Sequence, residues 1–123
     1  MRDEEHRIQC GCVKWFRMQY HQYSDLLFAV PNGGARDSVT GAKLKDEGVV
    51  AGVADLILLL PRQGFHALCI EMKTAKGTQR KSQREWQAKV MAQGYKYVVC
   101  RSIDDFMSEV NQYVNIQNQH QHE

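Results

Sequence analysis

Two short apolar runs, each carrying one acidic residue, most strongly constrain the fold of this 123-residue chain. The first covers residues 52–60 and contains Asp55, and the second covers residues 67–73 and contains Glu71. Their length, their Leu, Ile and Val content and the Gly and Pro residues beside them predict two buried strands. A buried carboxylate costs several kcal/mol unless it is paired or holds a metal. If the strands form a hairpin, Asp55, Glu71 and Lys73 meet at one end of the sheet.

These three charged side chains suggest a chemistry for that end of the sheet. Two converging carboxylates form an oxygen-rich site that suits a hard divalent cation such as Mg²⁺ or Mn²⁺. Lys73 lies two residues after Glu71, so both side chains are expected on one face of the strand. A lysine there would hold or deprotonate a water, or stabilise charge on a phosphate, as phosphodiester hydrolysis requires. A simpler interpretation stays open, in which Asp55 caps a strand end and Glu71 forms an ordinary ion pair with Lys73.

The rest of the chain predicts a mixed α/β fold. Apolar residues at helical spacing predict helices, and short apolar runs between turn formers predict strands. One hairpin among otherwise alternating units implies a central mixed four-stranded sheet flanked by helices, in the order αβαββαβα. The expected helices cover residues 3–23, 38 to 46 or 47, 82–93 and 103–115, and the expected strands cover residues 26–30, 55–60, 66–73 and 95–100.

The size and composition indicate one domain. A chain of 123 residues can bury a single core, and no linker or internal repeat divides it. We assign residues 1–115 to this domain and expect the polar tail, residues 116–123, to be disordered. No apolar run approaches the roughly 20 residues that span a bilayer, and residues 1–6 lack the core of a signal peptide. We therefore expect a cytoplasmic protein without membrane contact. The four cysteines have neither zinc-site nor disulfide-framework spacing.

Basic residues are concentrated in one segment of a nearly neutral chain. The net charge is only +2, but the segment from Lys73 to Arg84 contains five basic residues and no acidic one. Such a strip would contact phosphates on a nucleic acid. A solvated loop and helix start would explain the same pattern.

The order of several motifs resembles a known nuclease family. Asp55 followed by Glu71-Met72-Lys73 resembles the signature of the PD-(D/E)XK nuclease superfamily, with Ala54 at the position of the proline in that name. More specifically, nearly the whole chain, from about Glu4 to Val114, resembles the VRR-NUC domain. The segments that carry this resemblance are residues 5–9, 31–36, 48–56, 70–73 and 82–87, together with Gly94 and Tyr95. A bare Asp…Glu-x-Lys pattern would be weak, but this ordered set is specific.

The resemblance implies a restriction-endonuclease-like fold and a metal-dependent active site. Asp55 and Glu71 would bind Mg²⁺ or Mn²⁺, and the backbone carbonyl of Met72 would be a further ligand. Lys73 would be the catalytic lysine.

Two supporting positions are also implied by the resemblance. Glu5 would be the acid of the first helix that reaches the metal directly or through water, and Glu4 is the alternative if the helix phase differs by one. Gln87 would be the polar residue that supports the site from the helix after Lys73, and Gln83 is the alternative.

The resemblance further implies a stand-alone, phage-type endodeoxyribonuclease, working in a bacterial host as a homodimer on branched DNA such as a Holliday junction or a flap. No base-reading motif is visible, so structure-selective cleavage is favoured over site-specific cleavage. Two alternatives are a non-catalytic DNA-binding module on the same fold and a small α/β protein that binds an acidic metabolite or a protein. The expected DNA contacts are Arg36, Lys76, Arg80, Lys81 and Arg84.

Overall fold

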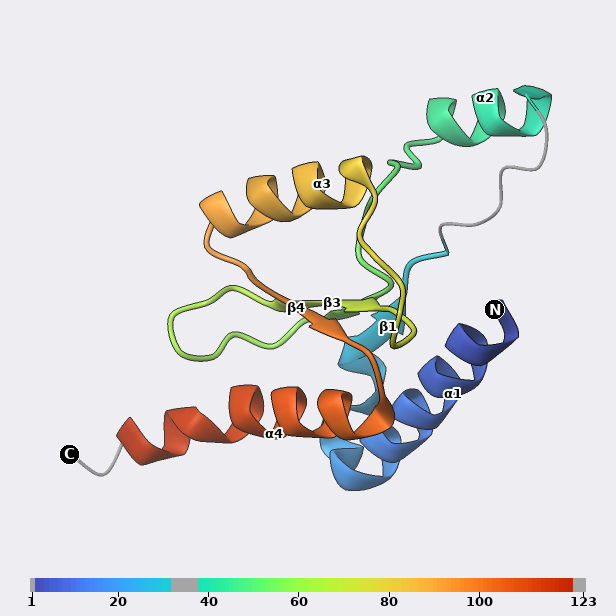
Figure 1. Cartoon of the computed structure of the whole chain (residues 1–123). Helices are drawn as coiled ribbons and strands as arrows, with labels where there is room; N and C mark the ends of the chain where they lie inside the picture. Colours follow the sequence, from blue (N-terminus) through green and yellow to red (C-terminus); the bar gives the residue numbers. More distant parts are fainter. Residues whose placement is uncertain (1, 32–37, 121–123) are drawn as a thin grey trace.

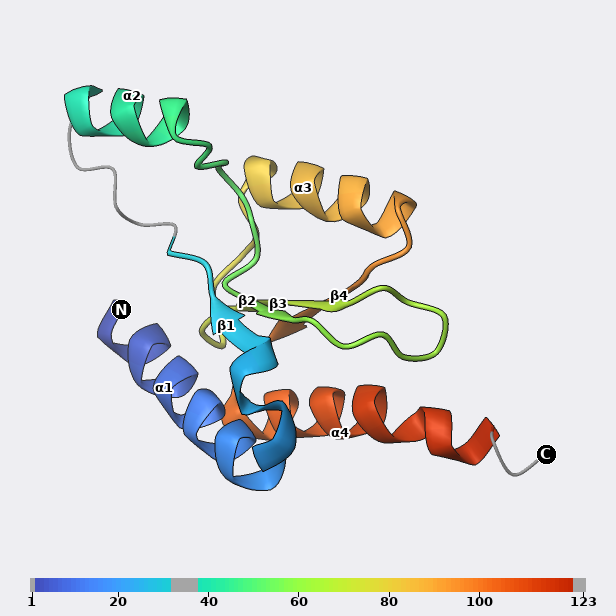
Figure 2. The same cartoon turned by 180° about the vertical axis from the view of Figure 1, so that it is seen from behind.

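A four-stranded mixed sheet forms the centre of the structure, a computed structural model that describes residues 2–31 and 38–120. The strands lie in the order β1 (Leu27–Ala29), β2 (Leu56–Leu58), β3 (Leu68–Met72) and β4 (Lys96–Cys100) (Figures 1 and 2). Strands β1 and β3 run antiparallel to β2, and β4 runs parallel to β3. This arrangement confirms the predicted mixed sheet and the hairpin between the two apolar runs.

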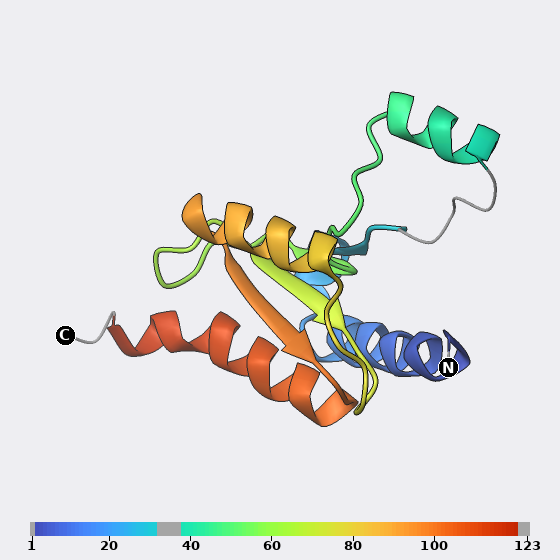
Figure 3. The same cartoon turned by 45° about the horizontal axis from the view of Figure 1, so that its top comes forward.

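Helices cover both faces of this sheet. Helix α3 (Lys81–Ala92) lies across one face, whereas α1 (Arg2–Gln19) and α4 (Ile103–His120) lie on the other (Figure 3). Helix α2 (Ser38–Asp46) stands away from the sheet, beyond α3 (Figure 2). None of these helices, within the described ranges, combines the length and apolar character that a membrane span requires.

Alternate residues of β3 enter two separate cores. Leu68, Ile70 and Met72 pack in the larger core with residues of α1 and α4. Cys69 packs in a smaller core with residues of α3 and β4. Because side chains alternate along a strand, Glu71 follows Cys69 to the α3 face. Burial on both faces explains why this stretch of sequence is almost continuously apolar.

The first helix is shorter than predicted. α1 ends at Gln19 rather than near Tyr23, and a 3-10 helix, η1 (His21–Leu26), leads into β1. Tyr20 lies at the junction, where its side chain is buried and its hydroxyl donates a hydrogen bond to Asn111 on α4. The two residues are 91 positions apart in the sequence, so local periodicity could not predict their contact.

The last helix is longer than predicted. α4 continues to His120 instead of ending near Asn115, so residue 115 is not a helix end. The turn between β2 and β3 contacts this part of α4, because Arg62 Nε donates a 3.0 Å hydrogen bond to the carbonyl of Val114. Gln63 Nε2 donates similarly to the carbonyl of Tyr113 at 3.1 Å. These contacts hold α4 to the β2–β3 turn near the end of the apolar face of the helix.

The expected strands are shortened at their ends. β2 has three residues rather than six, because Leu59 and Leu60 leave the ladder towards the turn at Pro61. Leu59 still donates its N–H to the carbonyl of Leu26 at 2.9 Å. Asp55 precedes β2 and accepts a backbone hydrogen bond from Val30 at 2.9 Å. The pairing therefore extends beyond the strand limits, and the position of Asp55 at the sheet end is unchanged.

Candidate active site

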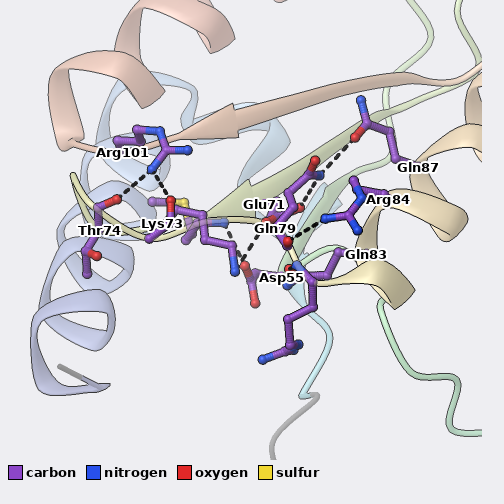
Figure 4. A network of polar contacts seen from close by, with 12 residues as sticks. Asp55, Glu71, Lys73, Thr74, Gln79, Gln83, Arg84, Gln87 and Arg101 are labelled. Carbon is purple, nitrogen blue, oxygen red and sulfur yellow. Dashed lines mark hydrogen bonds and ion pairs between the residues drawn. The ribbon is translucent and has the colours of Figure 1, made fainter.

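The hairpin brings Asp55, Glu71 and Lys73 together at one end of the sheet (Figure 4). Leu56 pairs with Ile70, so continuing this antiparallel register by one residue places Asp55 opposite Glu71. The N–H of Met72 donates a 2.6 Å hydrogen bond to Oδ2 of Asp55. This bond connects the segment before β2 to the end of β3.

Glu71 and Lys73 form a buried ion pair on the α3 face. Lys73 Nζ lies 3.5 Å from Glu71 Oε2, and the exposed fractions of the two side chains are 10% and 1%. The Lys73 N–H donates to the Cys100 carbonyl at 3.0 Å, which extends the β3–β4 pairing past the end of the strand. The sheet therefore restrains the backbone of Lys73, and its side chain is buried beside Glu71.

The two carboxylate oxygens of Glu71 have different surroundings. Oε1 accepts a hydrogen bond from the Tyr97 hydroxyl and another, of 2.9 Å, from Nε2 of Gln79. Oε2 is buried and receives no hydrogen bond from the described part of the chain, although the Lys73 ammonium lies beside it. A buried acceptor without a hydrogen bond is costly and is therefore a candidate position for a ligand.

Burial dominates the electrostatics of Asp55 and Tyr97. Desolvation raises the pKa of Asp55 above its usual 3.8, and the N–H of Met72 partly opposes this effect. The charges of Glu71 and Glu5 raise the pKa further, and Lys73 lowers it. Burial, reinforced by the hydrogen bond to Glu71, also raises the pKa of Tyr97. Tyr97 therefore remains a protonated donor at neutral pH.

These residues fit a hard divalent cation. The Asp55 carboxylate and the orphaned Oε2 of Glu71 are oxygen acceptors of the type that Mg²⁺ and Mn²⁺ prefer. Within the described ranges, no group of three or more His, Cys, Asp or Glu side chains could hold a metal. A cation here would accordingly rely on two carboxylates, a backbone carbonyl such as that of Met72, and water, which Mg²⁺ sites normally retain.

The first helix approaches this site through Glu5. Glu5 is half-buried and its charge acts on Asp55, whereas Glu4 is exposed. The helix phase thus puts Glu5 nearer to the carboxylates than Glu4. Its role as a metal ligand remains a prediction.

The two candidate glutamines of α3 have different partners. Gln87 Oε1 accepts a 2.9 Å hydrogen bond from Gln79 Nε2, and this same nitrogen donates to Glu71. Gln83 is buried, and its Oε1 accepts the Arg80 N–H at 2.8 Å, which stabilises the first turn of α3. Gln87 is therefore linked to Glu71 through one intervening side chain, and Gln83 caps the helix.

The family model of the VRR-NUC domain matches residues 1–104 of this chain. The chain belongs to the VRR-NUC family. It is also similar to a solved structure titled "VRR_NUC domain protein", with 29% sequence identity and a TM-score of 0.78. That match covers 89% of this chain and 87% of the other. No curated protein matches the sequence. Membership in this family of nuclease domains implies DNA as a partner.

The basic residues of this VRR-NUC domain follow the Glu-x-Lys strand. Lys76, Arg80 and Lys81 are exposed, and Lys81 Nζ lies 3.9 Å from Glu85 on the same helix. Arg84 is also exposed, but its Nη1 donates a 2.8 Å hydrogen bond to the backbone carbonyl of Gln79. Arg84 thus braces the loop before α3. The fifth expected DNA contact, Arg36, lies outside the described residues.

Three residues of the site were not predicted from the sequence. Gln79 and Tyr97 contact Glu71, and Arg101 holds the loop between β3 and α3. Tyr97 resembles an ordinary strand residue, and only its pairing with Cys69 reveals that it shares a face with Glu71. Gln79 lies in a basic segment, next to Arg80, and its position in the sequence does not mark it as a contact of Glu71. The usable signal was alternation along β4, applied together with the parallel register.

Proposed function

We propose that this VRR-NUC domain is a metal-dependent endodeoxyribonuclease that hydrolyses phosphodiester bonds. The observation that carries the proposal is the buried Oε2 of Glu71, which lacks a hydrogen bond and adjoins Lys73. Asp55 lies at the same sheet end with its pKa raised by burial. A divalent cation would satisfy the first acceptor and favour the ionised form of the second. Membership in the VRR-NUC family supports a nuclease function. The order of Asp55, Glu71 and Lys73 also resembles the PD-(D/E)XK signature.

Each residue of the site has a role in this proposal. Asp55 and Glu71 would hold Mg²⁺ or Mn²⁺, with the Met72 carbonyl as a further ligand and Glu5 reaching it directly or through water. When bound, the cation would lower the pKa of a coordinated water and offset negative charge on the phosphate. The Lys73 ammonium, kept in place by the sheet and by Glu71, would donate to a phosphate oxygen or to a water as charge develops.

The proposed substrate is branched DNA, a Holliday junction or a flap. Lys76, Arg80 and Lys81 are exposed on the loop and helix start that follow Lys73, and they would contact phosphates, which position DNA without reading its sequence. A homodimer would present two such sites to one junction. A phage-type member of the family would act in the cytoplasm of its bacterial host.

Cleavage of a panel of labelled DNAs tests this function. A four-way junction, a 5′ flap and a linear duplex are each incubated with Mg²⁺ or Mn²⁺ and the purified chain. We expect nicking of the branched DNAs, and loss of nicking in Asp55→Ala and Lys73→Met. The methionine keeps the apolar stem of the lysine, and circular dichroism checks that both variants fold.

Three outcomes would contradict parts of this proposal. Equal cleavage of linear and branched DNA would refute structure selectivity. Undiminished cleavage by both variants would refute the assigned site. Salt-dependent binding of DNA without cleavage under any divalent ion would instead identify a DNA-binding module on the nuclease fold.

A further inference from the structure

Two neutral side chains converge on a single oxygen of Glu71. The hydroxyl of Tyr97 and the amide nitrogen of Gln79 both donate to Oε1, and neither contacts Oε2. The donors come from different elements, β4 and the loop between β3 and α3. The carboxylate is thereby held from one side only.

Packing fixes Tyr97. Its side chain is 8% exposed and lies in the smaller core with Ala54 and Cys69. The ring centroid is 6.1 Å from that of Trp86 on α3. A ring confined in this way has little freedom to turn its hydroxyl from Glu71.

Two arginines hold the loop that carries Gln79. Arg101 Nη1 donates to the carbonyls of Thr74 at 2.8 Å and Gly77 at 2.6 Å. Arg84 Nη1 donates to the Gln79 carbonyl at 2.8 Å (Figure 4). The Gln79 side chain then bridges Glu71 and Gln87 with one nitrogen. Both the backbone and the side chain of Gln79 are therefore restrained.

The asymmetry has a consequence for the ion pair. A carboxylate beside an ammonium normally accepts a charge-assisted hydrogen bond from it, because such bonds are roughly twice as strong as neutral ones. Here Oε1 is occupied by two donors, and Lys73 Nζ remains 3.5 Å from Oε2 without forming a hydrogen bond. One oxygen is consequently kept for another ligand, and the lysine is not fully engaged by Glu71.

We propose that Tyr97 and Gln79 are positioning residues that fix Glu71 so that Oε2 alone is offered to a divalent cation. This inference rests on the proposed function and names the residues that prepare its metal ligand. Hydrogen bonds from such surrounding residues hold a ligand in its binding orientation, and their loss typically costs about 10–100-fold in metal affinity.

Calorimetric titration of the full chain with Mn²⁺, without DNA, tests the inference. We expect Tyr97→Phe and Gln79→Ala each to weaken Mn²⁺ binding at least about tenfold. The matched controls are Tyr95→Phe, directly before β4 and beside His66, and Gln93→Ala, exposed directly after α3. Both controls should bind Mn²⁺ as the unaltered chain does.

The cleavage rate supplies a second readout. With a four-way junction, Tyr97→Phe should need more Mn²⁺ for half-maximal cleavage, yet approach the unaltered maximal rate when Mn²⁺ saturates. A purely structural contribution would lower the melting temperature without changing Mn²⁺ affinity, and that result in both variants would overturn the inference. If the unaltered chain cleaves DNA but both variants bind Mn²⁺ normally, the inference fails and the proposed function stands. If the unaltered chain neither binds Mn²⁺ nor cleaves DNA, both fail.

Discussion

Asp55 is the residue at which folding and the proposed activity conflict. Burial raises its pKa, and the nearby charges of Glu71 and Glu5 add to the effect. An acid with a folded-state pKa above its unfolded value contributes full stability only below the unfolded pKa. That contribution is lost as the pH rises through the folded pKa. At neutral pH, above the usual pKa of aspartate, the buried Asp55 carboxyl therefore destabilises the metal-free chain, and a divalent cation would relieve this cost.

Asp55→Asn should stabilise the metal-free protein at neutral pH. The amide oxygen can still accept the Met72 N–H, while the buried ionisable carboxyl is removed. We expect the melting temperature in EDTA at pH 7 to rise by a few degrees, as a change of about 1 kcal/mol produces in a domain of this size. The advantage over the unaltered chain should shrink as the pH falls towards the usual pKa of aspartate. A difference that does not change with pH would contradict the assignment of this cost to ionisation.

At the scale of secondary-structure elements, the segment before β2 packs directly against the start of α3. Gly52 has a positive φ of 87°, and a Cβ there would lie 2.3 Å from the backbone oxygen of Ser82. This contact positions the segment that carries Asp55 beside the helix that carries Gln83 and Gln87. A side chain cannot be accommodated, because its neighbour is backbone rather than a movable side chain.

Gly52→Ala should therefore destabilise the fold by about 2 kcal/mol or more, since strain and a clash combine. Gly48→Ala is the matched control, because Gly48 has a φ of 104° but nothing within 4 Å of the added carbon. We expect it to cost about 1 kcal/mol, from backbone strain alone. Urea denaturation of both variants measures the difference. Equal losses would show that the contact with Ser82 is unimportant.

Some of these elements could be predicted from the sequence, and others could not. The β2–β3 hairpin was predictable because two apolar runs are bounded by turn formers and cannot be solvated. The site at its end followed, since Asp55 and Glu71 are acids in runs that exclude charge. The end of α1 was not predictable, because Tyr20 leaves the helix to contact Asn111 on α4. Tyr97 was missed for a similar reason, as its partner lies on the neighbouring strand.

At the scale of the whole molecule, the α3 side carries the features suited to DNA. α1 and α4 cover the opposite face of the sheet (Figure 3). Glu71 is linked through the side chain of Gln79 to Gln87 on α3. The exposed Lys76 and Lys81 lie on the loop and helix that follow β3. DNA that approaches along this side would meet the basic residues and the carboxylates together.

Replacing Lys76 and Lys81 with Gln should weaken DNA binding mainly at low salt. Each lost phosphate contact reduces the slope of log affinity against log salt by about 0.9, so the pair should reduce it by about 2. The matched control replaces Lys14 and Arg17, which are exposed on α1. Fluorescence anisotropy with a labelled four-way junction, in Ca²⁺ to prevent cleavage, measures both slopes. A similar reduction in the control pair would mean that DNA contacts are not concentrated on the α3 side.

Metal-dependent nicking by the unaltered chain and by Asp55→Asn tests the central claim most directly. The rate of nicking of a labelled four-way junction is followed as Mg²⁺ or Mn²⁺ is raised from zero in a chelator-treated sample. Asp104→Asn, a change at an exposed acid of α4, serves as the control. We predict nicking that rises with the cation and saturates for the unaltered chain and the control. For Asp55→Asn we predict nicking at least about a hundredfold slower, as for the loss of a group that stabilises the transition state. Nicking that needs no divalent cation, or that survives in Asp55→Asn, would contradict the account.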